Sequence, residues 1–159
     1  MEDQQQHFVS LIEQNKALIY KFCYMYANEA DTPQDLFQEV IINLWKGYPT
    51  FRGDCKVQTW IYRIALNTCV TFMRKSGSRP KTTALSEDLI VYDDATDVSQ
   101  IKELYMLINR LNEIEKAIVL LYLEERSYDE IAHIVGITRN NVGVRINRIK
   151  EKLSQMSNC

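Results

Sequence analysis

The chain has 159 residues, of which 46% are hydrophobic and 25% are charged, and its formal net charge is −2. These proportions are ordinary for a globular protein and exclude collagen-like and low-complexity chains. No run of about 18 apolar residues occurs, so we expect no insertion into a membrane. Five glycines, three prolines and long apolar repeats near 3.6 residues favour an all-α fold.

The cysteine pattern bears on the cellular compartment and on metal binding. Cys23, Cys55, Cys69 and Cys159 are far apart in the sequence and form no CxxC pair. The first residues are acidic and polar, unlike a signal peptide, so we expect a cytoplasmic protein with reduced thiols. The two histidines and the cysteine spacing also argue against a metal site, and we expect no cofactor.

Charge is strongly partitioned along the chain. Residues 51–81 carry a net charge of +6 and residues 126–159 carry +3, whereas residues 1–50 carry −4 and residues 82–99 carry −5. Two basic blocks separated by an acidic one indicate two nucleic-acid contacts joined by a tether. The acidic beginning of the chain is suited instead to a basic protein partner.

The first part of the chain predicts three helices. Apolar residues recur at helical spacing from about Gln4 to Ala27. Thr32 can cap a second helix that has Pro33 at its first position, and this helix should stop before Pro49. A third helix is expected over about Val57–Lys75. Together the three helices can bury their apolar stripes as one small bundle.

A linker and a second bundle should follow. Residues 77–97 contain Gly, Pro, Ser, Thr and Asp without helical periodicity, which is typical of a flexible acidic linker. Beyond it, apolar residues mark one helix, and Asn112 with Glu115 can open the next as a capping box. We therefore predict two small helical bundles, over residues 1–76 and 98–159, joined by this linker.

Residues 127–153 have the pattern of two short helices joined by a tight turn. Ser127 with Glu130 can form a capping box, Gly136 stands where a left-handed residue would end the first helix, and Thr138 can cap the second. Arg and Asn donors match base edges in the major groove, and the outward face of the second helix should carry Arg139, Asn140, Asn141, Arg145, Asn147, Arg148 and Lys150. This arrangement predicts a DNA-binding helix-turn-helix, although helical hairpins with a glycine turn also occur without DNA binding.

The other basic block has a different composition. Residues 48–81 interleave aromatic rings with cations, which suits stacking on unpaired bases and contact with a nucleic-acid backbone. Arg63, Asn67 and Arg74 have offsets of four and seven, so they share one face of the third helix. This face is a candidate surface for a DNA strand, although the same charges are also compatible with a merely solvated surface.

Three aromatic side chains near this block need separate interpretation. Trp60 fits a core position and a DNA contact equally well, and different edges of its ring can serve both. Phe72 and Trp45 continue the apolar stripes of their helices. We therefore interpret both of these rings as core side chains.

Several segments, in this order, resemble a known family. They are Asp35-Leu-Phe-Gln-Glu-Val, Leu44-Trp45, Phe51-Arg-Gly-Asp, Thr59-Trp-Ile-Tyr-Arg-Ile-Ala-Leu-Asn67, Ser127-Tyr-Asp-Glu-Ile-Ala and Gly136-Ile. Their order and spacing are similar to those of the small sigma factors of bacterial RNA polymerase, the extracytoplasmic-function (ECF) group. The resemblance covers nearly the whole chain outside the linker.

The resemblance implies a role for individual residues. It implies that the clamp of the largest polymerase subunit is contacted by four residues, Asp35, Gln38, Glu39 and Trp45. It assigns the reading of the −10 promoter element as melted strand to Phe51, Arg52, Lys56, Trp60, Arg63, Asn67 and Arg74. It assigns the reading of the −35 element as duplex to Arg139, Asn140, Asn141, Val144, Arg145, Asn147 and Arg148. Gly143 and Val144 stand where the family often has a cation followed by Ser, so promoter preference cannot be copied from relatives.

The implied function is that of a promoter-specificity subunit without catalytic chemistry of its own. Its partners would be core RNA polymerase, through the clamp and flap regions, promoter DNA and an anti-sigma factor. Opening about ten base-pair steps costs roughly 14 kcal/mol, and stacked bases return only about 1–3 kcal/mol each, so a host enzyme is required. The alternative is an autonomous helix-turn-helix regulator that binds a palindromic operator without polymerase. No motif indicates an enzyme.

Overall fold

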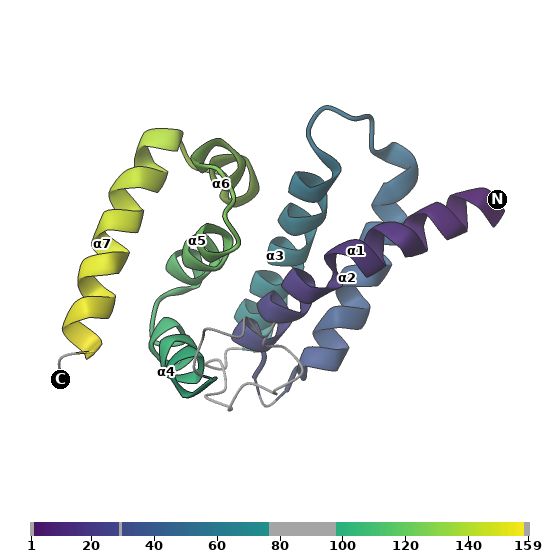
Figure 1. Cartoon of the computed structure of the whole chain (residues 1–159). Helices are drawn as coiled ribbons and strands as arrows, with labels where there is room; N and C mark the ends of the chain where they lie inside the picture. The colour runs from purple at the N-terminus through teal and green to yellow at the C-terminus, as the bar shows by residue number, and fades with distance from the viewer. Residues whose placement is uncertain (1, 29, 77–97, 158–159) are drawn as a thin grey trace. The chain divides into compact units, whose positions relative to one another are not determined.

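The computed structural model describes residues 2–28, 30–76 and 98–157, and in these residues it contains helices and no strand. This confirms the all-α class (Figure 1). The predicted linker, 77–97, and Cys159 lie outside the described residues. The chain divides into two compact units between Arg79 and Pro80, and each unit is described by itself.

The N-terminal unit is a three-helix bundle. It contains α1 (Glu2–Tyr26), α2 (Pro33–Gly47), the short 3-10 helix η1 (Tyr48–Thr50) and α3 (Val57–Ser76). Each long helix packs on the other two. The core is formed by fully buried side chains from all three helices, namely Ile19, Phe22, Cys23, Tyr26, Leu36, Val40, Leu44, Ile61, Ala65 and Cys69.

Local side-chain hydrogen bonds set the start of α2. The Thr32 hydroxyl accepts from the Asp35 N–H at 3.2 Å, and Pro33 takes the first helical position, as predicted. The turn before it is closed by Asn28, whose side-chain oxygen Oδ1 accepts hydrogen bonds from the N–H groups of Ala30 and Asp31 at 2.9 and 2.7 Å. The buried Asn28 thereby satisfies backbone donors between α1 and α2.

The core assignment of Trp45 was wrong. The Trp45 side chain is 41% exposed. It lies in the last turn of α2, one residue after the fully buried Leu44 and therefore about 100° around the helix from it, and its ring contacts Phe8 and Tyr48. Phe72 is only partly buried, because its ring borders a surface hollow beside the start of α2. Periodicity identified apolar positions on each helix but not how completely neighbouring side chains cover each ring.

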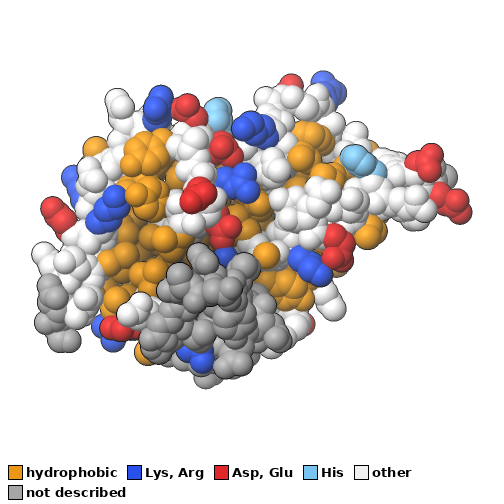
Figure 2. All heavy atoms as spheres, viewed as in Figure 1, with side chains coloured by type: hydrophobic (Ala, Val, Ile, Leu, Met, Phe, Trp, Pro, Cys, Tyr) orange, Lys and Arg blue, Asp and Glu red, His pale blue; other side chains and the backbone are white. Residues whose placement is uncertain are grey.

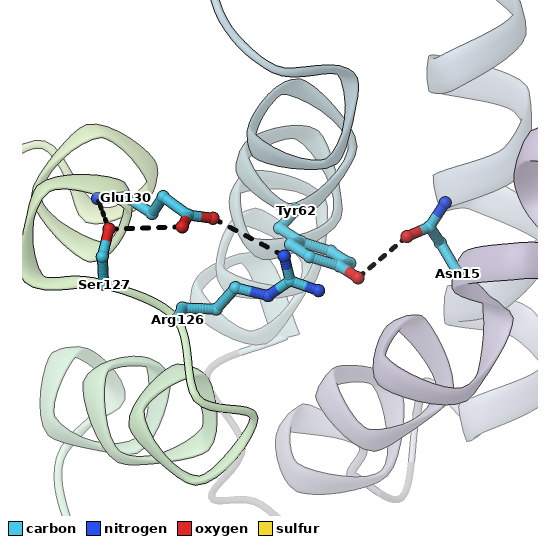
Figure 3. Close-up of polar contacts among 5 residues, drawn as sticks. All are labelled: Asn15, Tyr62, Arg126, Ser127 and Glu130. Carbon is cyan, nitrogen blue, oxygen red and sulfur yellow. Dashed lines mark hydrogen bonds and ion pairs between the residues drawn. The ribbon is translucent and has the colours of Figure 1, made fainter.

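Two buried contacts join α1 to α3. The Tyr62 hydroxyl donates to the Asn15 side-chain oxygen at 2.9 Å, and the Asn15 amide donates to the Leu11 carbonyl at 2.8 Å (Figure 3). Cys69 donates to Cys23 across 4.0 Å between the sulfur atoms. The hydrogen bond with Cys23 and burial together raise the pKa of the Cys69 thiol, and both cysteines, distant in sequence, are free.

The C-terminal unit contains α4 (Val98–Ile108), α5 (Glu113–Leu123), α6 (Tyr128–Val135) and α7 (Arg139–Ser157). Helix α5 packs on both α6 and α7, and α4 packs on α7. Because most of α5 is buried, it forms the centre of the unit. The side chains that meet around it are Ile108, Ala117, Ile118, Leu120, Leu121, Ile131, Ile134, Val142, Ile146 and Ile149.

The predicted helix-turn-helix is α6, its turn and α7. Ser127 accepts from the Glu130 N–H at 3.1 Å, and its own hydroxyl donates to the Glu130 carboxylate at 3.2 Å (Figure 3). The Glu130 carboxylate therefore contacts the Ser127 hydroxyl and is also ion-paired with Arg126 at 3.5 Å. Gly136 is left-handed with φ of 84°, and Thr138 accepts from the Asn141 N–H at 3.2 Å. Both predicted helix boundaries at the turn are confirmed.

The start and the end of α5 have different local chemistry. Asn112 and Glu115 form the complete capping box, with N–H to oxygen distances of 2.8 and 3.3 Å. At the other end, Glu125 takes a left-handed conformation with φ of 61°, and the Arg126 N–H closes the turn on the Leu121 carbonyl. A non-glycine residue in this conformation is strained by its Cβ atom.

Candidate nucleic-acid interface

Helix α7 presents part of its polar surface away from α5 and α6. Val142, Ile146 and Ile149 are buried, and at 100° per residue the opposite side of the helix carries Asn140 and Arg148. Also exposed on this side are Val144, at 47%, and Asn147. A surface with two amide side chains, one guanidinium and one branched apolar group suits hydrogen-bonding and methyl contacts with base edges.

Two other predicted −35 residues lie at the edges of this surface. Arg145 is partly buried on the side facing the start of α5, where Asn112, Glu115, Arg148 and Lys152 line a hollow of about 210 Å³ with it. Arg139 lies at the α6 side, with its Nε 3.7 Å from the Asp129 carboxylate. Asn141, the remaining member, is exposed in the first turn of α7. The predicted set is therefore all accessible at least in part, but it does not form a single row.

Gly143 lies beside an aromatic ring of the preceding helix. A Cβ atom at Gly143 would lie 3.5 Å from the Tyr128 ring, which is ordinary van der Waals contact. Tyr128 is itself 36% exposed at the first position of α6. An aromatic side chain therefore stands beside the exposed polar surface of α7, and an alanine at residue 143 would fit against it.

Lys150 is fully exposed and continues the same flank of α7. Its ammonium group lies 5.0 Å from the centre of the Tyr122 ring. The hydrogen bond with the Tyr122 hydroxyl is the main cause that raises the pKa of Lys150. This lysine therefore remains a cation throughout the neutral range and is available to a phosphate group.

A second polar row follows α3 in the N-terminal unit. Trp60, Arg63, Asn67 and Arg74 have helical spacings of three, four and seven, which places them in one narrow stripe. Asn67 and Arg74 are exposed, and Trp60 and Arg63 are partly buried. The structure thus brings four of the predicted −10 residues together on one helix face.

The loop before α3 places further aromatic and cationic groups at the end of this stripe. The Phe51 and Trp60 ring centres are 5.1 Å apart, and Arg52 and Lys56 are exposed. Trp60 approaches the backbone closely at Gly47, where a Cβ atom would come within 3.2 Å of the indole. Aromatic faces with adjacent cations are the combination that holds unpaired bases and their phosphates.

The start of α2 forms an acidic hollow of about 230 Å³. Its polar wall is made by Asp31, Asp35, Gln38 and Glu39, and its apolar lining by Leu36 and Phe72. Three of the four predicted clamp residues therefore meet here. Trp45 does not, because it lies six residues beyond Glu39, about 9 Å further along the helix axis. Sequence reasoning missed Asp31 and Phe72 as parts of this surface, although carboxylates at residues 31, 35 and 39 repeat every four residues.

The C-terminal unit also has an apolar groove beside α7, within the hydrophobic area that Figure 2 shows on this unit. Its volume is about 130 Å³, and its lining side chains are Leu104, Val119, Tyr122, Leu123, Ile146, Ile149, Lys150 and Leu153. Among the described residues, no helix is long and apolar enough to cross a membrane. Within the same part of the chain, no group of three or more His, Cys, Asp or Glu side chains is arranged to hold a metal ion.

Comparison with known proteins gives the family. The model of Sigma-70 region 2 matches residues 11–79, and that of Sigma-70 region 4 matches residues 101–153. The chain belongs to the sigma-70 family. The ECF RNA polymerase sigma-E factor of Haemophilus influenzae is 32% identical over 143 residues, which are 80% of this chain and 75% of that protein. The factor of the same name from Escherichia coli K12 is 31% identical over 145 residues, which are 80% and 74% of the two chains. These relatives confirm the ECF resemblance.

Solved structures agree with this sigma-factor fold. The sigma factor RpoE of Bartonella quintana, solved with the anti-sigma factor NepR, has a TM-score of 0.72 at 19% identity and covers 99% of this chain and 98% of its own. CnrH, solved with the cytosolic domain of CnrY, has a TM-score of 0.71 at 18% identity, covering 97% of this chain and 89% of its own. In this sigma factor, α3 and its preceding loop lie within region 2, and the helix-turn-helix lies within region 4.

Proposed function

We propose that this sigma factor binds core RNA polymerase and directs promoter-specific initiation of transcription. In this proposal α7 reads the −35 element as duplex in the major groove. The stripe on α3, with the loop at 51–56, holds the −10 element as melted strand. The observation that carries the proposal is this second surface, because a stripe of Trp60, Arg63, Asn67 and Arg74 beside an aromatic loop suits single-stranded DNA.

The requirement for strand opening separates this function from that of an autonomous regulator. A regulator needs one duplex-reading surface and a dimer contact, and it has no use for an aromatic surface suited to unpaired bases. Family membership also disfavours the regulator. The sigma-70 family consists of non-catalytic initiation factors, so the chemistry of transcription belongs to the polymerase.

The acidic hollow at the start of α2 is the proposed contact with the polymerase clamp. Asp35, Gln38 and Glu39 can receive the cationic end of a Lys or Arg side chain, while Leu36 and Phe72 cover its aliphatic stem. The apolar groove beside α7 is the proposed contact with the flap region. An anti-sigma factor is proposed as a further partner, since both structural neighbours were solved with a second protein. Action on the polymerase would place the protein in the cytoplasm.

Run-off transcription with purified core polymerase tests the central proposal. The chain should bind core enzyme and direct initiation from a cognate promoter, and a chain that holds duplex DNA tightly but never directs initiation would be a regulator. Asn67→Ala should lower the yield of open complexes more than it lowers duplex binding. Gln14→Ala, which changes an exposed amide on α1, is the matched control.

The duplex-reading half of the proposal has a separate test. Arg148→Ala should weaken binding to a −35 duplex and reduce the slope of log K against log salt by about 1, because one phosphate or base contact is lost. Arg110→Ala removes an exposed cation just after α4 and should leave the slope unchanged. Equal slopes for Arg148→Ala and the unmodified chain would mean that this face of α7 does not contact DNA.

A further inference from the structure

The N-terminal turns of α1 project past α2 (Figure 1) and precede residue 11, where the match to region 2 begins. Residues 2–7, 9 and 10 are exposed. Phe8, in contrast, is only 6% exposed. A single buried aromatic residue in an otherwise solvated helical segment must be held by a specific contact outside that segment.

The contact of Phe8 is with two rings at the far end of α2. Its ring lies edge-on to Trp45, with centres 5.0 Å apart and an interplanar angle of 62°. It lies in the same way against Tyr48, at 5.4 Å and 64°. Edge-to-face pairs at these separations are favourable and directional. Trp45 is 41% exposed and Tyr48 is partly buried, so this cluster lies apart from the bundle core.

The same cluster continues into the loop that precedes α3. Tyr48 lies 6.5 Å from Trp60, and Trp60 lies 5.1 Å from Phe51, measured between ring centres. The Phe51 N–H also donates to the Tyr48 carbonyl at 3.3 Å. A displacement of Tyr48 would therefore be passed to the Phe51 ring through Trp60, and to the Phe51 backbone through this hydrogen bond.

We propose that Phe8 is a positioning residue for the −10-reading loop, and this inference rests on the proposed function. Phe8 does not itself contact DNA. Through Tyr48 and Trp60 it fixes the position of Phe51, which keeps the loop ready to receive an unpaired base. The gain is pre-organisation, since a loop that is already ordered loses less entropy when it binds.

The test uses the full chain with core polymerase and a leucine substitution. Phe8→Leu keeps an apolar side chain and removes the ring edge, whereas Val9→Ala changes an exposed neighbour and is the matched control. Phe8→Leu should lower open-complex yield about tenfold, the effect of losing roughly one stacked base. Affinity for a −35 duplex should stay unchanged, because the helix-turn-helix lies in the other unit, and Phe8→Tyr should restore opening.

A second measurement on the chain without polymerase does not depend on promoter function. Cys55 lies in the loop at 51–56 and is partly exposed, so its alkylation rate, followed by mass spectrometry, reports loop order. Phe8→Leu should raise this rate several-fold, and Val9→Ala should not. Unchanged opening together with an unchanged Cys55 rate would overturn the proposal, as would a parallel loss of core and −35 binding. If the unmodified chain fails to direct initiation but Phe8→Leu still raises the Cys55 alkylation rate, the proposed function fails, and the structural link between Phe8 and the loop at 51–56 stands.

Discussion

The buried bond between Tyr62 and Asn15 allows a quantitative test of what holds α1 on α3. The donor and acceptor are 2.9 Å apart, and the two side chains are 3% and 6% exposed. Tyr62→Phe removes only the hydroxyl and withdraws this donor from a buried carbonyl oxygen. Such an unsatisfied acceptor costs about 1–3 kcal/mol. Because the Asn15 amide also donates to the Leu11 carbonyl at 2.8 Å, the side chain is not free to turn elsewhere, and we expect about 2 kcal/mol.

Tryptophan fluorescence can follow this loss selectively. Both tryptophans, Trp45 and Trp60, belong to the N-terminal unit, so urea unfolding monitored in this way reports on that unit alone. About 2 kcal/mol should lower the melting temperature of a unit of this size by roughly 10 °C. Tyr24→Phe, which removes the hydroxyl of a partly buried tyrosine on α1, is the control. Adding Asn15→Leu to Tyr62→Phe should cost less than the sum of the single changes. A Tyr62→Phe protein within about 0.5 kcal/mol of the unmodified chain would refute the reasoning.

Three further predictions follow from the two units. Burial lowers the pKa of Lys116 from 10.5 to about 8, so between pH 8 and 10.5 the unfolded chain binds one proton more than the folded chain. The free energy of unfolding should therefore rise with pH across this window, and Lys116→Met should remove this rise in unfolding curves followed by circular dichroism. Glu125→Gly should stabilise the C-terminal unit by about 0.5–1 kcal/mol, since relief of left-handed strain exceeds the added chain entropy, and a loss in urea unfolding would contradict this. Peptide mapping after alkylation should find Cys55 modified in the native protein, with Cys23 and Cys69 modified only after unfolding.

The sequence was most informative where structure is determined locally. Thr32 with Pro33, and Asn112 with Glu115, occupy the helix starts predicted for them, because a cap needs only the three or four residues that follow it. Gly136 ends α6 in the left-handed conformation for the same reason. The narrow stripe on α3 was also predictable, since residues on one rigid helix keep their angular relation whatever the tertiary packing.

Contacts between distant segments were not predictable in this way. Periodicity assigned Trp45 to the core, but its ring lies against Phe8 of α1 and still remains 41% exposed, because the extent of this cover depends on how α1 crosses α2. The proximity of Phe72 to Asp31 depends on how α3 crosses the start of α2. The left-handed conformation of Glu125 was also not visible, because its sequence lacks the usual glycine. For the two aromatic rings the missing information is the relative placement of elements, which the hydrophobic pattern constrains only to a face; for Glu125 it is a local conformation that the residue type does not favour.

Two ion pairs on α7 show how stability and recognition can be separated within one helix. Arg139 and Asp129 are 3.7 Å apart with side chains 69% and 66% exposed, whereas Lys152 and Glu115 are 2.7 Å apart with Glu115 only 9% exposed. An exposed pair contributes about 0–1 kcal/mol, less than the roughly 1–3 kcal/mol of a good base contact. In the proposed reading of the −35 element, DNA can therefore take Arg139 from Asp129 at little cost. Lys152 instead neutralises a carboxylate that caps α5, so its removal should weaken the fold before it weakens DNA binding.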